Sequence, residues 1–153
     1  MTADFSELRV KMVDGQLRTT DVTSLPLLTA MLSVPREAFV PENCRSLAYI
    51  DRNLLISGES GQGARYLMKP SPFAKLVQLA EIGPNDKVLD VGAGTGYSAA
   101  VLSKLAKSVV ALESDISLGD KAESTLADLG YDNVSVVRCD LKAGHEAGGP
   151  YDA

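Results

Sequence analysis

The sequence has few residues of the kinds that build metal sites and disulfide frameworks. Its two cysteines, Cys44 and Cys139, lie far apart, and neither has a second cysteine or a histidine at ligand spacing. This pattern argues against a zinc site and against a disulfide framework, so we expect no bound metal. A reduced, cytoplasmic protein fits such cysteine usage best.

Long apolar stretches are also missing. No segment approaches the roughly 20 apolar residues that a membrane-spanning helix needs. The N-terminal residues, MTADFSELRVK, include acidic side chains and lack the apolar core of a signal peptide. The sequence therefore predicts a soluble protein that is neither exported nor membrane-bound.

A basic surface is the third absence. The formal net charge is −5, and residues 81–153 carry six Lys/Arg against twelve Asp/Glu. Proteins that follow the phosphates of a nucleic acid need a basic patch, so we expect no nucleic-acid partner. The acidic half would suit a cationic cofactor, although a solvated acidic surface is the simpler interpretation of the charge alone.

What is present is enough for one folded core. The chain has 153 residues, of which 45% are apolar, and nothing in its composition indicates disorder. A single structural domain is therefore the default expectation.

The most informative segment is KVLDVGAGTG at residues 87–96. Its apolar, β-branched run is typical of a buried parallel strand, and three glycines at alternate positions allow a sharp turn and close approach to a ligand. Helical spacing resumes at residues 97–106. Strand, glycine turn and helix in this order are the first part of a nucleotide-binding unit.

The elements before this segment are predicted from apolar spacing, caps and turn residues. We expect helices at 4–17, at 24–31 with Ser24 as cap, and from Ser71-Pro72 to about residue 81. Between them we expect an ordered connector at 34–41, a small hairpin at 47–56 turning at Asp51–Asn53, and a glycine-rich loop at 57–66. Residues 83–86 then form a turn.

After the glycine turn, the pattern alternates regularly. Strands are expected at 108–113 and 134–138 and a helix at 118–129, so the whole reads β-α-β-α-β with strand order 3-2-1. Residues 151–153 look like the start of a fourth strand, which suggests a fragment. We predict an α/β, Rossmann-like fold: the N-terminal half of a doubly wound, mainly parallel sheet with a helical N-terminal extension. Residues 1–70 would form the helical and substrate-loop segment and 71–153 the incomplete core, together in one structural domain.

Two cofactors compete for the glycine turn. A dinucleotide fingerprint is matched in part by Gly94, Gly96 and Ala99, and such partial matches are weak. The other frame is Asp90-x-Gly92-x-Gly94-x-Gly96, which resembles motif I of the class I S-adenosylmethionine-dependent methyltransferases. An acid at this place can bind the ammonium group of the cofactor.

Acids also follow the next two strands. Glu113 ends its strand, where a carboxylate can accept hydrogen bonds from ribose hydroxyls in either cofactor type. Asp140 follows the third strand, where methyltransferases commonly hold the adenine amino group, although an exposed loop acid is as good an interpretation. The candidate cofactor-binding residues are Asp90, Gly92, Ala93, Gly94, Thr95, Gly96, Glu113, Ser114, Asp140 and Leu141.

The N-terminal half favours one family. In order, the segments MVDGQLR (12–18), AMLSVPREAFVP (30–41), AYIDRNLLI (48–56), Gly61-Gln62 and VLDVGAGTGYSAAVLSKLA (88–106) resemble the protein-L-isoaspartate (D-aspartate) O-methyltransferase family. The resemblance implies an enzyme that transfers a methyl group from S-adenosyl-L-methionine to the carboxylate of isoaspartyl residues in damaged proteins or peptides, a step of protein repair. The alternatives are a relative that binds the cofactor without this activity and a fragment of an NAD-dependent dehydrogenase.

The chain departs from the family in one place. The family has a polar block, Gly-Gln-Thr-Ile-Ser-Gln-Pro, before the sheet, whereas here Gly61-Gln62 continues into GARYLMKPSP. Aligning Lys69-Pro70 with the family's Gln-Pro puts Met68 at the serine position, and aligning Ser71-Pro72 leaves a serine nearby. Gln62 and Ser71 are therefore the candidate catalytic residues. Arg65 or Lys69 could pair with a substrate carboxylate, although solvated loop charges are the simpler interpretation.

The implied chemistry needs no general base. A carboxylate is already ionised near neutral pH, so the protein has only to align it and keep the site dry. This agrees with the single histidine, His145, which lies in a polar loop and is interpreted as solvated.

Overall fold

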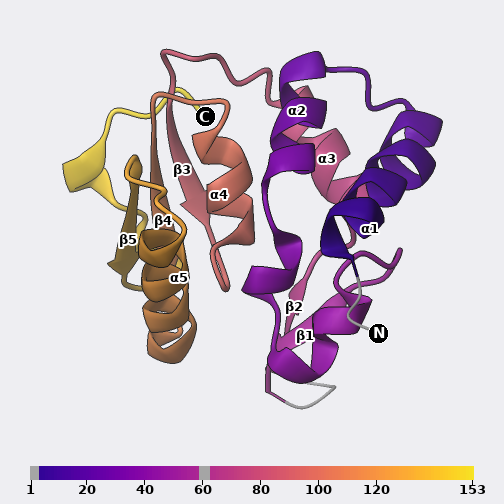
Figure 1. Cartoon of the computed structure of the whole chain (residues 1–153). Coiled ribbons are helices and arrows are strands. Elements are labelled where there is room, and N and C mark those ends of the chain that lie inside the picture. The colour runs from indigo at the N-terminus through magenta and orange to yellow at the C-terminus, as the bar shows by residue number, and fades with distance from the viewer. Residues whose placement is uncertain (1–3, 59–62) are drawn as a thin grey trace. The chain divides into compact units, whose positions relative to one another are not determined.

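A parallel sheet organises the second half of the chain in the computed structural model, which describes residues 4–58 and 63–153 (Figure 1). Its three strands are β3 (Lys87–Val91), β4 (Ser108–Glu113) and β5 (Val134–Arg138), side by side in the order β3-β4-β5. Both pairings are parallel, as predicted, with Val91 opposite Leu112 and Glu113 opposite Arg138. The carboxyl ends of the strands therefore meet at one edge of the sheet.

Two helices pack on these strands. Helix α4 (Tyr97–Ser103) contacts β3 and β4, and α5 (Ile116–Asp128) contacts β4 and β5. Helix α4 is buried along most of its length, and α5 begins two residues earlier than predicted because the Asp115 carboxylate accepts a hydrogen bond from the Leu118 N–H at 3.0 Å. The predicted Rossmann-like α/β arrangement is confirmed.

The end of the chain runs along the other side of β3. The Asp152 N–H donates to the Lys87 carbonyl at 2.8 Å, and the Leu89 N–H donates to the Ala153 carbonyl at 2.9 Å. These bonds lie where we expected a fourth strand to begin.

The chain divides into two compact units, Met1–Glu81 and Ile82–Ala153. The first contains α1 (Phe5–Met12), α2 (Leu25–Ser33), β1 (Leu54–Ser57), β2 (Arg65–Leu67) and α3 (Pro70–Leu79). Helix α3 thus belongs with the N-terminal elements, whereas the sequence-based division at residue 70 grouped it with the sheet. The single structural domain stays a prediction. In the described parts of the chain, no helix is long and apolar enough to cross a membrane.

The first predicted helix, 4–17, consists of two pieces, and a third short turn follows it. Helix α1 begins after Asp4, whose carboxylate accepts hydrogen bonds from the N–H groups of Ser6 and Glu7. It ends at Met12 and continues as a π-helical turn, Val13–Leu17, and a 3₁₀ turn, Arg18–Thr20. The second predicted helix is confirmed as α2, with Ser24 as its cap.

The predicted hairpin within residues 47–56 is wrong. Strand β1 pairs instead with β2 in antiparallel fashion, with Leu54 opposite Leu67. The Asp51–Asn53 segment precedes β1, and the Asn53 side chain accepts a hydrogen bond from the Lys69 N–H at 2.9 Å. Ala48 and Tyr49, which we expected in the first strand of that hairpin, are buried. They form hydrogen bonds with other segments of the first unit.

Helix α3 also begins earlier than predicted. Its cap is Lys69 and its first residue is Pro70, so Ser71 lies inside the first turn and is not the cap. Either proline satisfies the preference for proline at the start of a helix, and the sequence does not say which one does.

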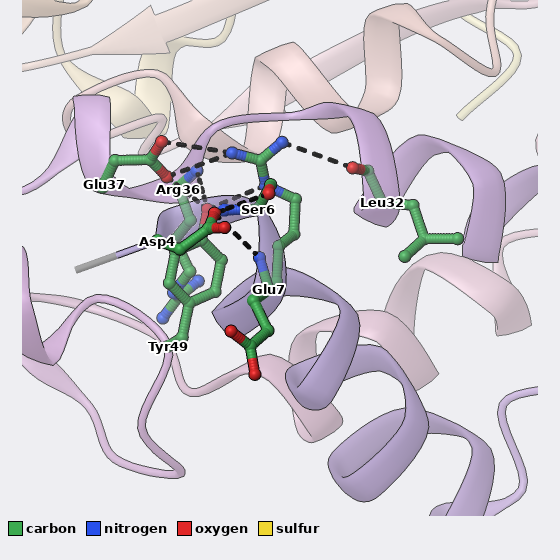
Figure 2. Close-up of polar contacts among 8 residues, drawn as sticks. Asp4, Ser6, Glu7, Leu32, Arg36, Glu37 and Tyr49 are labelled. Carbon is green, nitrogen blue, oxygen red and sulfur yellow. Dashed lines mark hydrogen bonds and ion pairs between the residues drawn. The ribbon is translucent and has the colours of Figure 1, made fainter.

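A part-buried polar cluster joins three segments of the first unit (Figure 2). The Arg9 guanidinium of α1 donates to the Tyr49 hydroxyl at 2.9 Å and to the Glu37 carboxylate at 3.1 Å. The Tyr49 hydroxyl in turn donates to Glu37. Burial, together with the hydrogen bond to Glu37, raises the pKa of Tyr49, so the phenol keeps its proton. The cluster fastens α1 to the VPREAFVP connector and to the segment before β1.

Arg36, next to Glu37, is buried completely. Its Nε–H donates to the Ala48 carbonyl at 2.6 Å, and its Nη2 donates to the Met68 carbonyl at 2.8 Å. One guanidinium therefore holds the segment before β1 and the residue that follows β2. A planar fork with several donors can join two carbonyls in this way, and a lysine cannot do so with the same geometry.

We predict that Arg36→Met destabilises the protein by about 2–4 kcal/mol, because the Ala48 and Met68 carbonyls lose their charged donor. Urea unfolding followed by circular dichroism measures this change. Arg52→Met is the matched control, since Arg52 is exposed, and it should change the free energy of unfolding by less than about 0.5 kcal/mol. Equal midpoints for the two variants would contradict the structural role of Arg36.

Candidate cofactor site

The glycine turn between β3 and α4 depends on its glycines. Gly92, Gly94 and Gly96 have φ angles of 79°, 59° and 98°, in the left-handed region that other residues rarely adopt. The Gly92 N–H donates to the Leu112 carbonyl of β4 at 2.8 Å, which directs the turn over the end of the neighbouring strand. Ala93 and Thr95, between the glycines, are buried.

Gly96 is needed for a second reason. A Cβ atom at this position would lie 3.1 Å from Leu126 Cδ1 and 3.2 Å from Ala122 Cβ, both on α5. The third glycine of the turn therefore lets α5 pack directly against the start of α4.

Glu113, at the end of β4, forms a hydrogen bond with the backbone of the glycine turn. Its side chain is fully buried, and its Oε2 accepts a hydrogen bond from the Gly94 N–H at 2.7 Å. Its Oε1 accepts from the N–H groups of Ser114 and Asp115 at 2.9 and 3.0 Å. Sequence reasoning assigned this acid to a ribose and missed its contact with the glycine turn. The parallel register of β3 and β4 is the signal from which this contact could have been found.

Asp90 lies in β3, two residues before the turn. Its Oδ2 accepts a hydrogen bond from the Ser98 hydroxyl of α4 at 2.6 Å. Burial raises the pKa of Asp90 to about 6; the negative charge of Glu113 acts in the same direction, and the Ser98 hydrogen bond opposes it. The two carboxylates of the predicted site therefore influence each other.

An open cavity of about 630 Å³ lies beyond the ends of β4 and β5. It brings Ser114 and Asp140 together, as predicted, and it is also lined by Ile116, Arg138 and Cys139, which sequence reasoning missed. Ile116 is 68% exposed, although it is apolar and stands at the first position of α5. Asp140 is exposed and caps a short turn that begins at Leu141, where its carboxylate accepts from the Lys142 N–H at 2.9 Å.

The cofactor candidates thus lie on one edge of the sheet, while the catalytic candidates belong to the other unit. Gln62 lies outside the described residues. Ser71 is in α3 and shares a hydrogen bond of 2.8 Å with the Thr20 hydroxyl. His145 precedes a short turn after β5, where its carbonyl accepts a hydrogen bond from the Tyr151 hydroxyl. The described residues include no cluster of three or more potential metal ligands.

Comparison with known proteins identifies the family. The sequence model of the protein-L-isoaspartate(D-aspartate) O-methyltransferases matches residues 9–153. The chain belongs to this family. The protein-L-isoaspartate O-methyltransferase 1 of Rhodopseudomonas palustris (strain HaA2) is 40% identical over 97% of the chain, and the corresponding enzyme of Protochlamydia amoebophila is 41% identical over 92%. The chain spans 59% and 65% of the lengths of these two relatives.

Solved structures agree with this family assignment. A protein-L-isoaspartate O-methyltransferase structure superposes with a TM-score of 0.79 and 27% identity, covering 95% of this chain and 45% of its own. A Plasmodium falciparum protein in complex with S-adenosyl-L-homocysteine superposes with a TM-score of 0.71 over 96% of this chain and 68% of its own. The latter is 19% identical and therefore supports the fold alone.

The raised pKa of Asp90 generates a prediction about stability. A folded-state pKa above the ordinary 3.8 means that the neutral carboxyl favours the folded state, and this contribution is lost as the pH rises through about 6. Asp90→Asn removes the ionisation and keeps an oxygen for Ser98. We therefore expect the variant to be more stable than the parent by about 1–3 kcal/mol above pH ~7, with little difference below pH ~4.

Urea unfolding at both pH values tests this expectation. Asp128→Asn, at the exposed end of α5, is the matched control and should stay within about 0.5 kcal/mol of the parent. A stability difference for Asp90→Asn that does not change with pH would show that the carboxyl titrates as it does in the unfolded chain.

Proposed function

We propose that the chain is the cofactor-binding part of an S-adenosylmethionine-dependent methyltransferase that methylates the carboxylate of isoaspartyl residues in proteins and peptides. The observation that supports it most is the edge of the sheet at which Asp90, the glycine turn and Glu113 come together, in a chain of this family. The cytoplasmic location expected from the cysteine pattern belongs to the same proposal.

The residues at this edge fit the cofactor. The Asp90 carboxylate, largely ionised above its pKa of about 6, suits the ammonium group of the methionine part. The glycine turn lets the backbone approach a ligand. Glu113, the acid predicted for the ribose, is buried and bound to three backbone N–H groups, so its proposed role is to fix that turn. The proposed contacts are otherwise those predicted from the sequence, namely Asp90, Gly92, Ala93, Gly94, Thr95, Gly96, Ser114, Asp140 and Leu141.

The cavity beyond β4 and β5 fits the adenine. Ile116 offers an exposed apolar surface for the face of the base, and Asp140 offers an acceptor for its amino group. The partial dinucleotide frame includes Ala99, whose burial in α4 fits that frame as well, because its third position serves close packing of the helix. It is the family of the chain that disfavours an NAD-dependent dehydrogenase.

The chemistry places modest demands on the protein. S-adenosylmethionine, when bound, supplies an activated methyl group. An isoaspartyl carboxylate is ionised near neutral pH, so the chain has only to orient it and exclude water. We keep Ser71 and Gln62 as candidates for positioning the acceptor peptide.

A second function is favoured by one observation. When Lys69-Pro70 is aligned with the family's Gln-Pro, Met68 falls where the family pattern has a serine hydroxyl. A relative that binds the cofactor without methylating isoaspartate would fit this departure. The first experiment therefore separates cofactor binding from methyl transfer.

We predict that S-adenosyl-L-homocysteine binds the chain in calorimetric titration and NADH does not. Methyl transfer from radiolabelled cofactor, measured with an isoaspartyl peptide and its aspartyl counterpart, should favour the isoaspartyl peptide. Binding of the cofactor product with no transfer to either peptide would support the second function. Binding of NADH alone would contradict both.

We further predict that Ile116→Ser weakens S-adenosyl-L-homocysteine binding roughly fivefold, about 1 kcal/mol, because part of an apolar side chain is lost from the adenine contact. Leu129→Ser is the matched control, since it removes a comparably exposed leucine just beyond the opposite end of α5. An unchanged affinity for Ile116→Ser would remove Ile116 from the site.

A further inference from the structure

A polar cavity of about 310 Å³ lies within the first unit, at the start of α3. Its walls include Gln16, Thr20, Asp51, Lys69, Ser71 and Lys75. The volume falls at the lower end of the roughly 300–1,000 Å³ that is usual for small-ligand sites. The space is thus sufficient for a side chain and the adjoining backbone of a peptide.

Gln16, one of the residues that line the cavity, has an acceptor that lacks a donor. The Gln16 amide donates to the Tyr49 carbonyl at 2.7 Å, whereas its Oε1 is buried and has no hydrogen-bond partner. Leaving a buried acceptor unpaired is costly, so a donor from a ligand would relieve it. Gln16 stands in the π-helical turn Val13–Leu17, a geometry that is frequent at functional sites.

The same cavity contains cationic groups that are available to a ligand. Lys75 is exposed and forms no ion pair with any described residue, and Lys69 is only loosely paired, with its Nζ 3.6 Å from Asp51 Oδ1. Such an exposed pair contributes little and can exchange partners. When Lys69-Pro70 is aligned with the family's Gln-Pro, Lys69 stands where that block has an uncharged glutamine.

A hydroxyl completes the donor set. Thr20 donates its proton to the Gln16 carbonyl at 2.7 Å, which leaves the Ser71 hydroxyl to donate to Thr20. The Ser71 proton can rotate towards an incoming carboxylate, because a hydroxyl turns freely about its C–O bond.

We propose that this cavity binds an acidic side chain of the methyl-acceptor peptide. The carboxylate of that side chain is held by Lys69 and Lys75 with the Ser71 hydroxyl, and a peptide N–H donates to Gln16 Oε1. Two cations and an orphan acceptor in one cavity match a peptide segment that offers a carboxylate and a backbone donor. The inference rests on the proposed function in one respect, since that function identifies the peptide as the acceptor.

The carboxylate held here is not the one that reacts. A carboxylate whose oxygens are engaged by two ammonium groups is stabilised and is a weaker nucleophile. The reacting carboxylate needs an oxygen that is free to attack, so the lysines fit a second acidic group of the same peptide. The cavity is therefore a specificity site for acidic sequence context.

Four fluorescein-labelled peptides test this proposal with the full chain. Their central residue is isoaspartate or aspartate, and the residue beside it is Glu or Gln. Fluorescence anisotropy at low ionic strength should give about fivefold to tenfold tighter binding of the Glu peptides than of the Gln peptides, whichever central residue is present. Added salt should reduce this preference.

Lysine variants locate the effect. Lys75→Gln should reduce the preference for Glu about twofold to fivefold, the double variant Lys69→Gln/Lys75→Gln should abolish it, and Lys75→Arg should retain it. Lys121→Gln, at an exposed lysine of α5, is the matched control and should leave the preference unchanged. Circular dichroism and S-adenosyl-L-homocysteine titration check that each variant is folded.

Equal affinity of the parent chain for Glu and Gln peptides would overturn the proposal, as would the same loss in Lys121→Gln as in Lys75→Gln. Methyl transfer, measured with the same four peptides, tests separately whether the chain methylates the isoaspartyl residue. A preference for Glu without methyl transfer would contradict the proposed activity and support the cavity as a site for acidic peptides.

Discussion

The hydrogen bond from the Gly94 N–H to the buried Glu113 carboxylate is the interaction on which the cofactor site depends. Parallel pairing brings the ends of β3 and β4 together, but it does not by itself define the path of the loop that follows β3. The glycines can adopt left-handed backbone angles without steric strain. The hydrogen bond to Glu113 then fixes the loop in one of the conformations that the glycines allow. The same carboxylate adds to the rise in the pKa of Asp90. One side chain thus contributes to both the shape and the electrostatics of this edge.

A buried carboxylate is costly unless it is well paired, and Glu113 is paired with three backbone N–H groups at 2.7–3.0 Å. Asp90, 2.6 Å from a single hydroxyl donor, is less well compensated, and its raised pKa reflects that difference. A cationic ligand would supply a positive charge to balance the Asp90 carboxylate. The protein itself thus supplies the hydrogen-bond donors of Glu113, whereas Asp90 would gain its main partner from a ligand. Binding sites commonly contain groups that lower the stability of the free protein and strengthen ligand binding.

How far the sequence predicts this structure varies with the range of the interactions. Strands β4 and β5 have the predicted bounds, because short apolar runs between turns define them locally. The partner of β1 is not local: it is β2, across the glycine-rich segment, whereas the turn-forming residues Asp51–Asn53 favoured a nearer but wrong partner. The residues predicted for the cofactor occupy the expected edge, since parallel topology places strand ends together. Ile116 was missed because an exposed apolar residue is unremarkable in a sequence until its place beside a cavity is known.

Binding of the methyl-acceptor peptide makes different demands on the protein from binding of the cofactor. Attack on a methyl group requires a carboxylate with an uncommitted oxygen, so a site cannot both hold that group firmly by cations and let it react at full strength. Affinity for an anionic peptide must then come from charges placed against another group of the peptide. Lys69 and Lys75 meet this requirement, because they lie in a cavity with an unpaired acceptor and are weakly engaged by the protein itself. The departure from the family pattern between β2 and α3 is thus more economically explained as a change in the peptides selected than as a loss of the site.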